Sequence, residues 1–386
     1  MDALWFSLAY QKFDVTNQSW EEFKILIHIA TYLFFESTLL VQMFLPEVLF
    51  IISMLIDVGP MDLRTLVYEL LMNVCNSLVI NSILPSENKQ LLDDLTDNFS
   101  ASKVKYIAGF SQYKGDILPS FNSGSFATKF NILESFIDNI LLLMEGPSPY
   151  ESYQWRAKYK RYLSQLVFTQ NPSLSARATM ILGITGKSHT SLVLLKNLLT
   201  RTMMVIAEPT INTDNVFMTL SHAFAYSKIV EGLEPDFVVL RRMFWFAMNI
   251  MYTDHPSIFG GGLIFMASCA SRLYEYHFEH GVGKTTLVQE LIDSREFAEA
   301  ELVQQESKYQ ITWSEDNFVS VIVAFIARAL SISAMRAGAI ESLIGLFKNA
   351  YREYQLFPEA TQFKSYMFLL FLTVDADQFA GILRSI

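Results

Sequence analysis

The sequence is poor in charged residues, above all in basic ones, and poor in residues that form turns. Only 18% of its 386 residues are charged, with 29 Lys and Arg against 39 Asp and Glu. It holds 16 Gly and 11 Pro, whereas 51% of the residues are hydrophobic. This composition favours long helices joined by short connections. The net charge of −10 argues against a general nucleic-acid binder, because phosphate contacts need clustered Lys and Arg.

Cysteines, long apolar runs and strand patterns are also scarce. Cys75 and Cys269 lie in apolar segments, which predicts no disulfide framework and suits a reducing compartment. The uncharged runs 70–86 and 256–271 contain 17 and 16 residues, short of the ~20 that a spanning helix needs, so we interpret them as core helices. The N-terminus has neither a basic region nor a cleavage site of a signal peptide. We therefore expect a cytoplasmic protein without a membrane span, and the lack of alternating apolar residues predicts an all-α fold.

Helix-starting residues and glycines divide the chain into predicted helices. One stretch, from Pro172 to Phe246, starts with proline, ends on an apolar helix and holds three helix-length apolar segments between. The other predicted helices cover residues 19–35, 46–57, 61–79, 85–99, 126–144, 150–168, 256–279, 287–305, 314–329, 331–348 and 359–371. The fold class that we predict is a HEAT/ARM-like α-solenoid of stacked antiparallel helix pairs. It forms a single region over residues 1–386, with a subdivision near the 109–125 loop into residues 1–108 and 126–386.

A loose internal repetition supports a helical-repeat array. At three places a helix-starting residue comes shortly before an arginine, and a long apolar helix follows. The pairs are Pro60 with Arg64, Pro172 with Arg177, and Ser331 with Arg336. This arrangement is typical of the turn and second helix of HEAT-type repeats, although the intervals are irregular.

The stretch from Gly281 to Thr286 resembles a degenerate phosphate-binding loop around Lys284. A Walker A loop needs a glycine where this chain has Phe278, and it needs a preceding strand where residues 273–278 read as the end of a helix. A glycine that ends one helix before the next begins is the simpler interpretation. A nucleotide-binding enzyme that uses Lys284 stays open as an alternative.

Histidines supply no convincing metal or catalytic site. His277 and His280 are three residues apart, with Glu275 and Glu279 beside them, but a structural zinc site needs four ligands and no second cluster is present. We interpret both as solvated residues at a helix end. The other histidines form no triad pattern with a serine or cysteine. The sequence predicts no cofactor, no metal and no catalytic residue.

Residues 155–162 mix cations with aromatic side chains. At helical spacing Trp155, Tyr159 and Tyr162 share one face, which leaves the cations largely outside on an amphipathic helix. Contact with an acidic partner stays open for this patch. Its candidate contact residues are Arg156, Lys158, Lys160 and Arg161.

Four motifs, in matching order and approximate spacing, carry a resemblance to a known family. They are Val-Gly-Pro-Met-Asp-Leu-Arg at 58–64, Ile-Ala-Gly-Phe-Ser at 107–111, Asn-Pro-Ser-Leu-Ser-Ala-Arg-Ala at 171–178 and Met-Phe-Trp-Phe-Ala at 243–247. With them the chain resembles, from about residue 25 to 374, the C-terminal helical-repeat region of neurofibromin and the fungal Ira-type inhibitory regulators of Ras. The motif residues that we expect to build the repeats are Gly59, Pro60, Leu63, Arg64, Asn171, Pro172, Leu174, Arg177, Phe244 and Trp245.

The resemblance implies that the parent protein is a large cytosolic GTPase-activating protein for Ras. It also implies that any recruitment of this chain to membranes occurs through the parent protein. It also implies that this chain is not the activating part, because the Phe-Leu-Arg motif of such domains is missing from it. Two of the motif arginines, Arg64 and Arg177, could bond across neighbouring repeats.

The function that we expect is therefore a non-catalytic scaffold. Its partners would be other segments of the same large protein, a second copy of the chain and regulatory proteins, with Ras reached only through the absent activating domain. An unrelated solenoid adaptor, for transport or protein turnover, is the remaining alternative.

Overall fold

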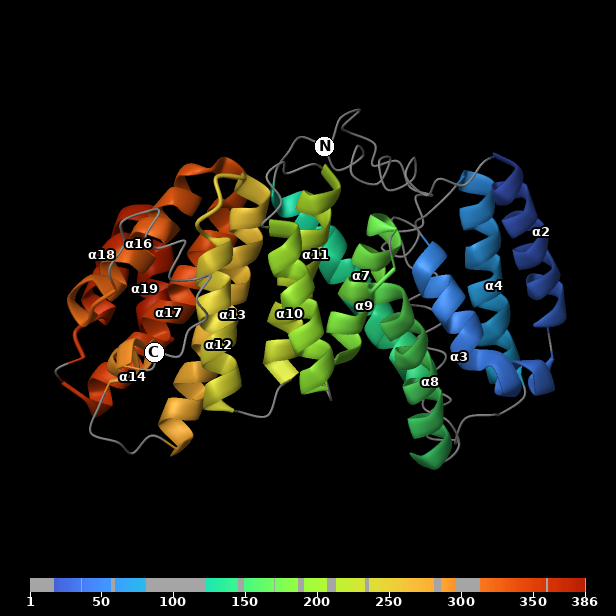
Figure 1. The fold of residues 1–386 in the computed structure, drawn as a ribbon, viewed down its shortest axis with the longest axis horizontal. Helices are drawn as coiled ribbons and strands as arrows, with labels where there is room; N and C mark the ends of the chain where they lie inside the picture. The colour runs from blue at the N-terminus through green and yellow to red at the C-terminus, as the bar shows by residue number, and fades with distance from the viewer. Residues whose placement is uncertain are drawn as a thin grey trace. The chain divides into compact units, whose positions relative to one another are not determined.

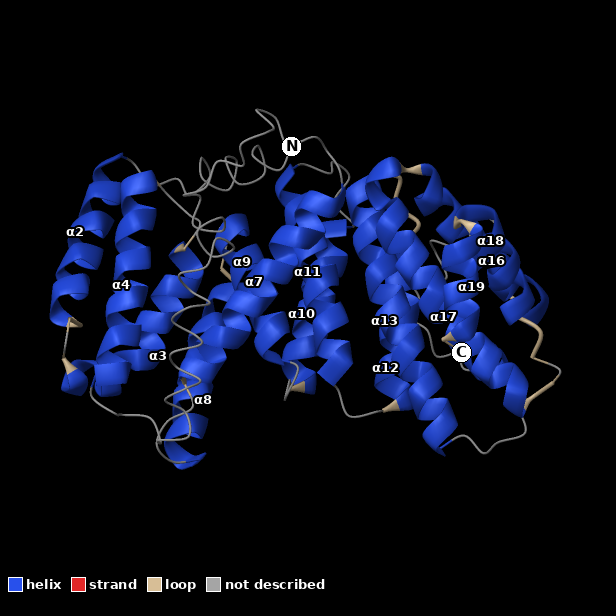
Figure 2. Ribbon diagram, turned by 180° about the vertical axis from the view of Figure 1, so that it is seen from behind, coloured by secondary structure: helices blue, strands red, loops and turns tan. Residues whose placement is uncertain are grey.

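The computed structural model describes most of the chain. The described residues are 17–35, 37–56, 60–80, 123–144, 149–169, 171–186, 191–206, 213–232, 236–280, 286–293, 295, 313–358 and 360–385. They form fifteen α-helices and one 3-10 helix, and these ranges contain no strand (Figures 1 and 2). The prediction of an all-α fold of stacked helices is confirmed. Two compact units, Met1–Thr185 and Gly186–Ile386, make up the chain, and each is described by itself.

Unit 1 (Met1–Thr185) is built around the pairing of α3 and α4. Its helices are α2 (Asn17–Leu33), α3 (Thr38–Leu55), α4 (Met61–Ile80), α7 (Ser123–Leu143), α8 (Pro149–Val167) and most of α9 (Pro172–Gly186). Helix α4 packs against both α2 and α3, and α3 also packs against α8. The core consists of aliphatic and aromatic side chains such as Leu45, Leu49, Ile52, Val67 and Phe136, which are almost completely buried.

One predicted boundary in unit 1 is wrong. The helix expected to begin at Pro46 begins at Thr38 and runs through Pro46 to Leu55. Proline has no N–H for the preceding turn, yet Leu45 and Leu49 on either side of it are 0% exposed. The burial of this apolar face outweighs the lost hydrogen bond, because most helical stability in proteins comes from tertiary packing.

Unit 2 (Gly186–Ile386) is organised around the long helix α13. Its elements are α10 (Leu192–Ile206), α11 (Thr213–Gly232), α12 (Phe237–Ile250), α13 (Pro256–His280), α14 (Leu287–Asp293), α16 (Glu315–Ser331), η2 (Ser333–Met335), α17 (Arg336–Leu356), α18 (Phe363–Thr373) and α19 (Ala376–Arg384). Helix α13 packs most extensively against α11 and α12 and also packs against α17, while α17 packs against α18 (Figure 1).

Three consecutive glycines, residues 260–262, allow α13 to pack closely on three sides. A Cβ atom added at Gly262 would lie 2.9 Å from side-chain atoms of Ile250 and Met251, at the end of α12. Cβ atoms at the two preceding glycines would meet side chains of η2 and α11 at 3.1 and 3.0 Å. Successive residues of a helix point about 100° apart, so the three glycines face three neighbouring elements.

The helices of unit 2 differ from the predicted helices in two places. The helix predicted at 331–348 begins only at Arg336, because Ile332 is extended (φ −97°, ψ 108°) and η2 intervenes. Helix α19 was not predicted, although Asp375 caps it by accepting a hydrogen bond from the Gln378 N–H at 2.8 Å. An aspartate followed by a short amphipathic turn is the signal that could have found it.

Several predictions concern residues that the structure does not describe. The helix at 85–99, most of the helix at 287–305 and nearly all of the 109–125 loop lie outside the described residues. The subdivision at that loop stays a prediction. Among the described helices, none is both long enough and apolar enough to cross a bilayer.

The glycine contacts lead to a first testable prediction. Gly262→Ala should lower the free energy of unfolding by about 1–3 kcal/mol, because the new methyl group overlaps Ile250 and Met251. Gly345 on α17 is the matched control, since no heavy atom lies within 4 Å of its added Cβ. Gly345→Ala should stabilise the chain by about 0.5–1 kcal/mol. Urea denaturation measures both, and equal shifts in the two variants would contradict the close packing of α13.

Candidate functional site

A buried polar contact joins three helices of unit 1 at one residue, Ser53 of α3. Arg177 of α9 is 7% exposed, and its Nε and Nη2 donate to the Ser53 carbonyl oxygen at 3.2 and 2.9 Å. Tyr159 of α8 donates from its hydroxyl to Ser53 Oγ at 2.8 Å. Ser53 lies near the end of α3 (Leu55), where carbonyl groups lack intrahelical partners and a positive charge is favourable. Arg177 therefore caps α3 from another helix.

The motif at 171–178 positions this arginine. The Asn171 side chain accepts from the Leu174 N–H at 3.1 Å, and Pro172 is the first residue of α9. An Asn cap followed by proline fixes the start of a helix. The Asn side chain accepts a hydrogen bond from an N–H of the first turn, and proline has no N–H that needs a partner. The bond from Arg177 to Ser53 joins two helices that are far apart in the sequence.

The motif at 58–64 forms a different contact. Gly59 lies outside the described residues, Pro60 precedes α4, and Leu63 is 0% exposed. Among the described residues no hydrogen bond joins the Arg64 side chain to another helix, and its buried Nε has no partner there. The Arg177 side chain thus bonds to another helix of unit 1, whereas among the described residues the Arg64 side chain does not. Bonds of these arginines across neighbouring repeats stay a prediction.

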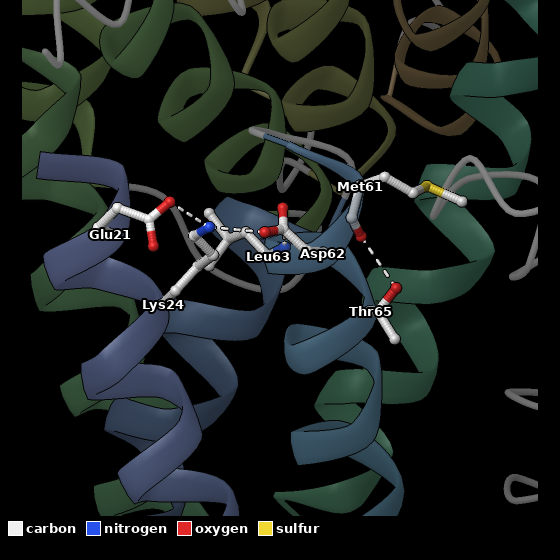
Figure 3. Close-up of polar contacts among 6 residues, drawn as sticks. All are labelled: Glu21, Lys24, Met61, Asp62, Leu63 and Thr65. Carbon is white, nitrogen blue, oxygen red and sulfur yellow. Dashed lines mark hydrogen bonds and ion pairs between the residues drawn. The ribbon is translucent and has the colours of Figure 1, made fainter. Parts of the chain in front are cut away.

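Instead, an ion pair links the start of α4 to α2 (Figure 3). Lys24 Nζ lies 2.6 Å from Asp62 Oδ2 and also pairs with Glu21. The hydrogen bond to Asp62 raises the pKa of Lys24, and the same bond lowers the pKa of Asp62. Because the Asp62 carboxylate is solvent-exposed, the pair contributes little to stability.

The motif at 243–247 forms an aromatic cluster in unit 2. Phe244 and Trp245 are 1% and 3% exposed and belong to the interhelix core. Phe244 stacks on Phe318 of α16 with 6.0 Å between the ring centres. Trp245 packs edge-on against Trp313 with 5.2 Å between the ring centres. The guanidinium of Arg295 lies 4.4 Å from the centre of the Trp245 ring. These contacts hold α12 against α16 and the segment before it.

The four candidate cations on α8 do not form one exposed patch. Arg156 is half-buried, and its Nη2 donates to the Leu141 carbonyl oxygen of α7 at 3.4 Å. Lys160 is also half-buried, and burial lowers its pKa. The prediction that these two side chains lie outside is wrong, because Arg156 bonds to α7 and Lys160 is partly buried within the fold.

The other two cations, Lys158 and Arg161, are exposed. Lys158 pairs with Glu47 of α3, which also accepts from the Tyr162 hydroxyl at 3.3 Å. Lys158 is therefore engaged within unit 1. Contact of this face with an acidic partner stays a prediction.

His277 is buried, so its interpretation as a solvated residue is wrong. It is 1% exposed, with Nδ1 3.5 Å from Glu290 Oε2 and Nε2 3.9 Å from Glu353 Oε1. Glu353 is 0% exposed and accepts from the Leu287 N–H at 2.7 Å. The three side chains come from α13, α14 and α17. Across the described residues, no group of three or more His, Cys, Asp or Glu is arranged to hold a metal ion.

The same contacts bear on the phosphate-binding alternative. Residues 281–285 lie outside the described residues, but the element before them is α13, a helix ending at His280, whereas a phosphate-binding loop follows a strand. At the start of α14 the Leu287 N–H is occupied by the Glu353 carboxylate, which would repel a phosphate. Both observations argue against nucleotide binding around Lys284.

A second histidine is buried, and sequence analysis did not predict its burial. His222 of α11 is 0% exposed, and its Nδ1 lies 2.7 Å from Thr202 Oγ1 of α10. Thr202 Oγ1 also lies 2.6 Å from the Tyr226 hydroxyl. Burial lowers the pKa of His222 to about 3, so the imidazole is neutral near pH 7 and joins two helices.

Replacement of Arg177 tests the capping contact. Arg177→Met should lower the free energy of unfolding by about 2–3 kcal/mol, because the buried Ser53 carbonyl loses a charged hydrogen-bond donor. Arg161→Met, at an exposed position of α8, should change it by less than about 0.5 kcal/mol. Chemical denaturation compares the two, and equal stability of both variants would refute the capping role.

Glu353 should make the stability depend on pH. Burial, the largest cause, raises the pKa of its carboxyl from 4.5 to about 7. The folded chain then binds this proton more tightly than the unfolded chain, so the contribution to stability is present below about pH 4.5 and is lost as the pH rises through about 7.

Glu353→Gln should remove that slope, because the amide keeps an acceptor for Leu287 but does not ionise. At about pH 8 the variant should be more stable than the parent chain by roughly 1–3 kcal/mol, since one pKa unit corresponds to about 1.4 kcal/mol. Glu341→Gln, exposed on the same helix, is the control. Thermal unfolding between about pH 5 and 8 gives the slopes. Unchanged slopes in Glu353→Gln would show that another group is responsible.

The helices and their interhelix contacts define an all-α helical-repeat segment. The described motif residues lie at helix starts, at a helix cap and in an aromatic core, and the buried side chains of Arg177 and Glu353 bond to other helices. The motif at 107–111 lies outside the described residues. No family model matches the chain.

Comparison with known proteins identifies relatives. The chain is 45% identical over 375 residues to the inhibitory regulator protein IRA2 of Saccharomyces cerevisiae, which covers 97% of this chain and 12% of that protein. It is 45% identical over 373 residues to IRA1 of the same yeast, with the same shares covered. Over nearly its whole length the chain thus matches an Ira-type region. It spans about 12% of the length of the curated relatives it matches.

Proposed function

We propose that this chain is a non-catalytic, helical-repeat scaffold within a Ras GTPase-activating protein, a negative regulator of Ras signalling. The observation that carries the proposal is the 45% identity over 97% of the chain to two proteins named as inhibitory regulators, of which it spans only 12%. Identity at this level over so long a stretch supports a shared role for the segment. The activating step belongs to other parts of the polypeptide.

The contacts of the polar groups support the scaffold role. Arg177 caps α3, Glu353 caps α14, and His222 joins α10 to α11. A group that performs acid–base chemistry must reach a reactant, whereas each of these side chains is at least nine-tenths buried and bonded to its own fold. Their contribution is to fix how the helices pack.

The partners that we propose are other segments of the same large protein, a second copy of the chain and regulatory proteins. The net charge of −10 favours protein partners over nucleic acid. Arg161 of α8 is exposed and is the best-placed of the four candidate cations for an acidic partner. We propose that the chain acts in the cytoplasm and that any attachment to membranes is made by the parent protein.

A GTP hydrolysis assay tests the absence of catalysis. Residues 1–386 at saturating concentration should leave the rate of GTP hydrolysis by Ras unchanged, and the natural full-length protein should raise it in the same assay. An activating domain that supplies an arginine finger accelerates hydrolysis by about 10³–10⁵-fold. An acceleration of that order by the 1–386 chain would overturn the proposal.

A further inference from the structure

One face of α2 carries apolar side chains that the described residues of unit 1 leave exposed. We call it the outer stripe, and it consists of Ile25, Leu26, Ile29, Tyr32 and Leu33, which are 60%, 62%, 49%, 70% and 54% exposed. Their spacing of i, i+1, i+4, i+7 and i+8 places them on one side of the helix. Tyr32 has a ring contact with His28, which belongs to α2 itself.

The opposite side of α2 is apolar as well. Ile27 is 4% exposed on the face of α2 that is buried in unit 1, and Phe34, directly after the helix, is 8% exposed. No Asp, Glu, Lys or Arg stands between Lys24 and Glu36 in the sequence. A helix that is apolar on both sides is typical of one buried between two layers, whereas the end of a repeat array has a polar outer face.

The outer stripe is more than the normal share of apolar surface. Single exposed apolar residues are common on soluble proteins, but contiguous apolar patches mark interaction sites. Helical spacing suits an occupant that is itself a helix, whose side chains fit the rows along α2.

The relatives extend far beyond the matched region. The chain spans 12% of each, so that most of their polypeptide lies outside the matched region. We propose that the outer stripe of α2 is a repeat-to-repeat interface in the natural protein, covered by an amphipathic helix of the same polypeptide that lies outside residues 1–386. This inference rests on the proposed function only in treating the chain as a segment of a larger array.

Unit 2 shows the same pattern on α18. Phe368, Phe371 and Leu372 are 64%, 66% and 62% exposed, whereas Tyr366 and Leu370 on the other side are 2% and 0% exposed. A second helix with two apolar sides is expected if both units continue into further repeats.

Hydrogen exchange compares the two states of the stripe directly. The amides of residues 25–33 are measured in the 1–386 chain and in the natural full-length protein. In the full-length protein they should exchange at least about tenfold more slowly, because a covering helix suppresses local opening. Equal rates in the two proteins would overturn the proposal.

Two tyrosines give a matched pair of variants. Tyr32 in the stripe and Tyr153 on α8 are 70% and 73% exposed. Tyr32→Ser should lower the melting temperature of the full-length protein and leave that of the 1–386 chain unchanged, whereas Tyr153→Ser should change neither. Equal effects of Tyr32→Ser in both proteins would contradict an occupant outside the chain.

A second copy is the competing occupant. Light scattering of the 1–386 chain should show no dimer that depends on the stripe. A stable dimer abolished by Ile25→Ser with Ile29→Ser would assign the stripe to self-association and overturn the proposal. None of these outcomes depends on the GTP hydrolysis assay, so failure of the scaffold function and failure of this interface are distinguishable.

Discussion

The packing of α13 on several neighbours at once is the constraint on which unit 2 depends. A helix can be buried on three sides only where side chains are small enough to let other elements approach, and residues 260–262 provide this with three glycines. Glycine weakens an isolated helix by about 1 kcal/mol per residue, so the apolar contacts with α11 and α12 must offset that cost. The helix is stable because other elements of unit 2 pack against several of its sides.

Buried polar side chains then determine how the helices are arranged. Apolar packing alone tolerates many arrangements, whereas a buried donor or acceptor is stable only where its partner lies. Arg177 requires the end of α3, and Glu353 requires the start of α14. The residues that in an enzyme would suggest chemistry thus specify helix positions, which supports the proposed scaffold role.

Local signals made much of the fold predictable from the sequence. Proline starts and apolar periodicity located α4, α8 and α13 to within about two residues, and also the start of α9. Contacts between distant residues could not be predicted in the same way. The burial of His277 depends on Glu353, which belongs to a helix much later in the chain, and Pro46 is accommodated by packing that the sequence does not display. For the same reason the sequence motif found Arg177 but not its partner, Ser53.

The central claim of the proposed function is that this chain acts by docking to the rest of its protein. The most direct measurement is a calorimetric titration of residues 1–386 with the remainder of the natural protein, produced as a separate chain. We predict saturable one-to-one binding with a Kd of about 1 μM or tighter, the strength expected of a specific interface. Absence of binding at concentrations of about 100 μM would contradict the account.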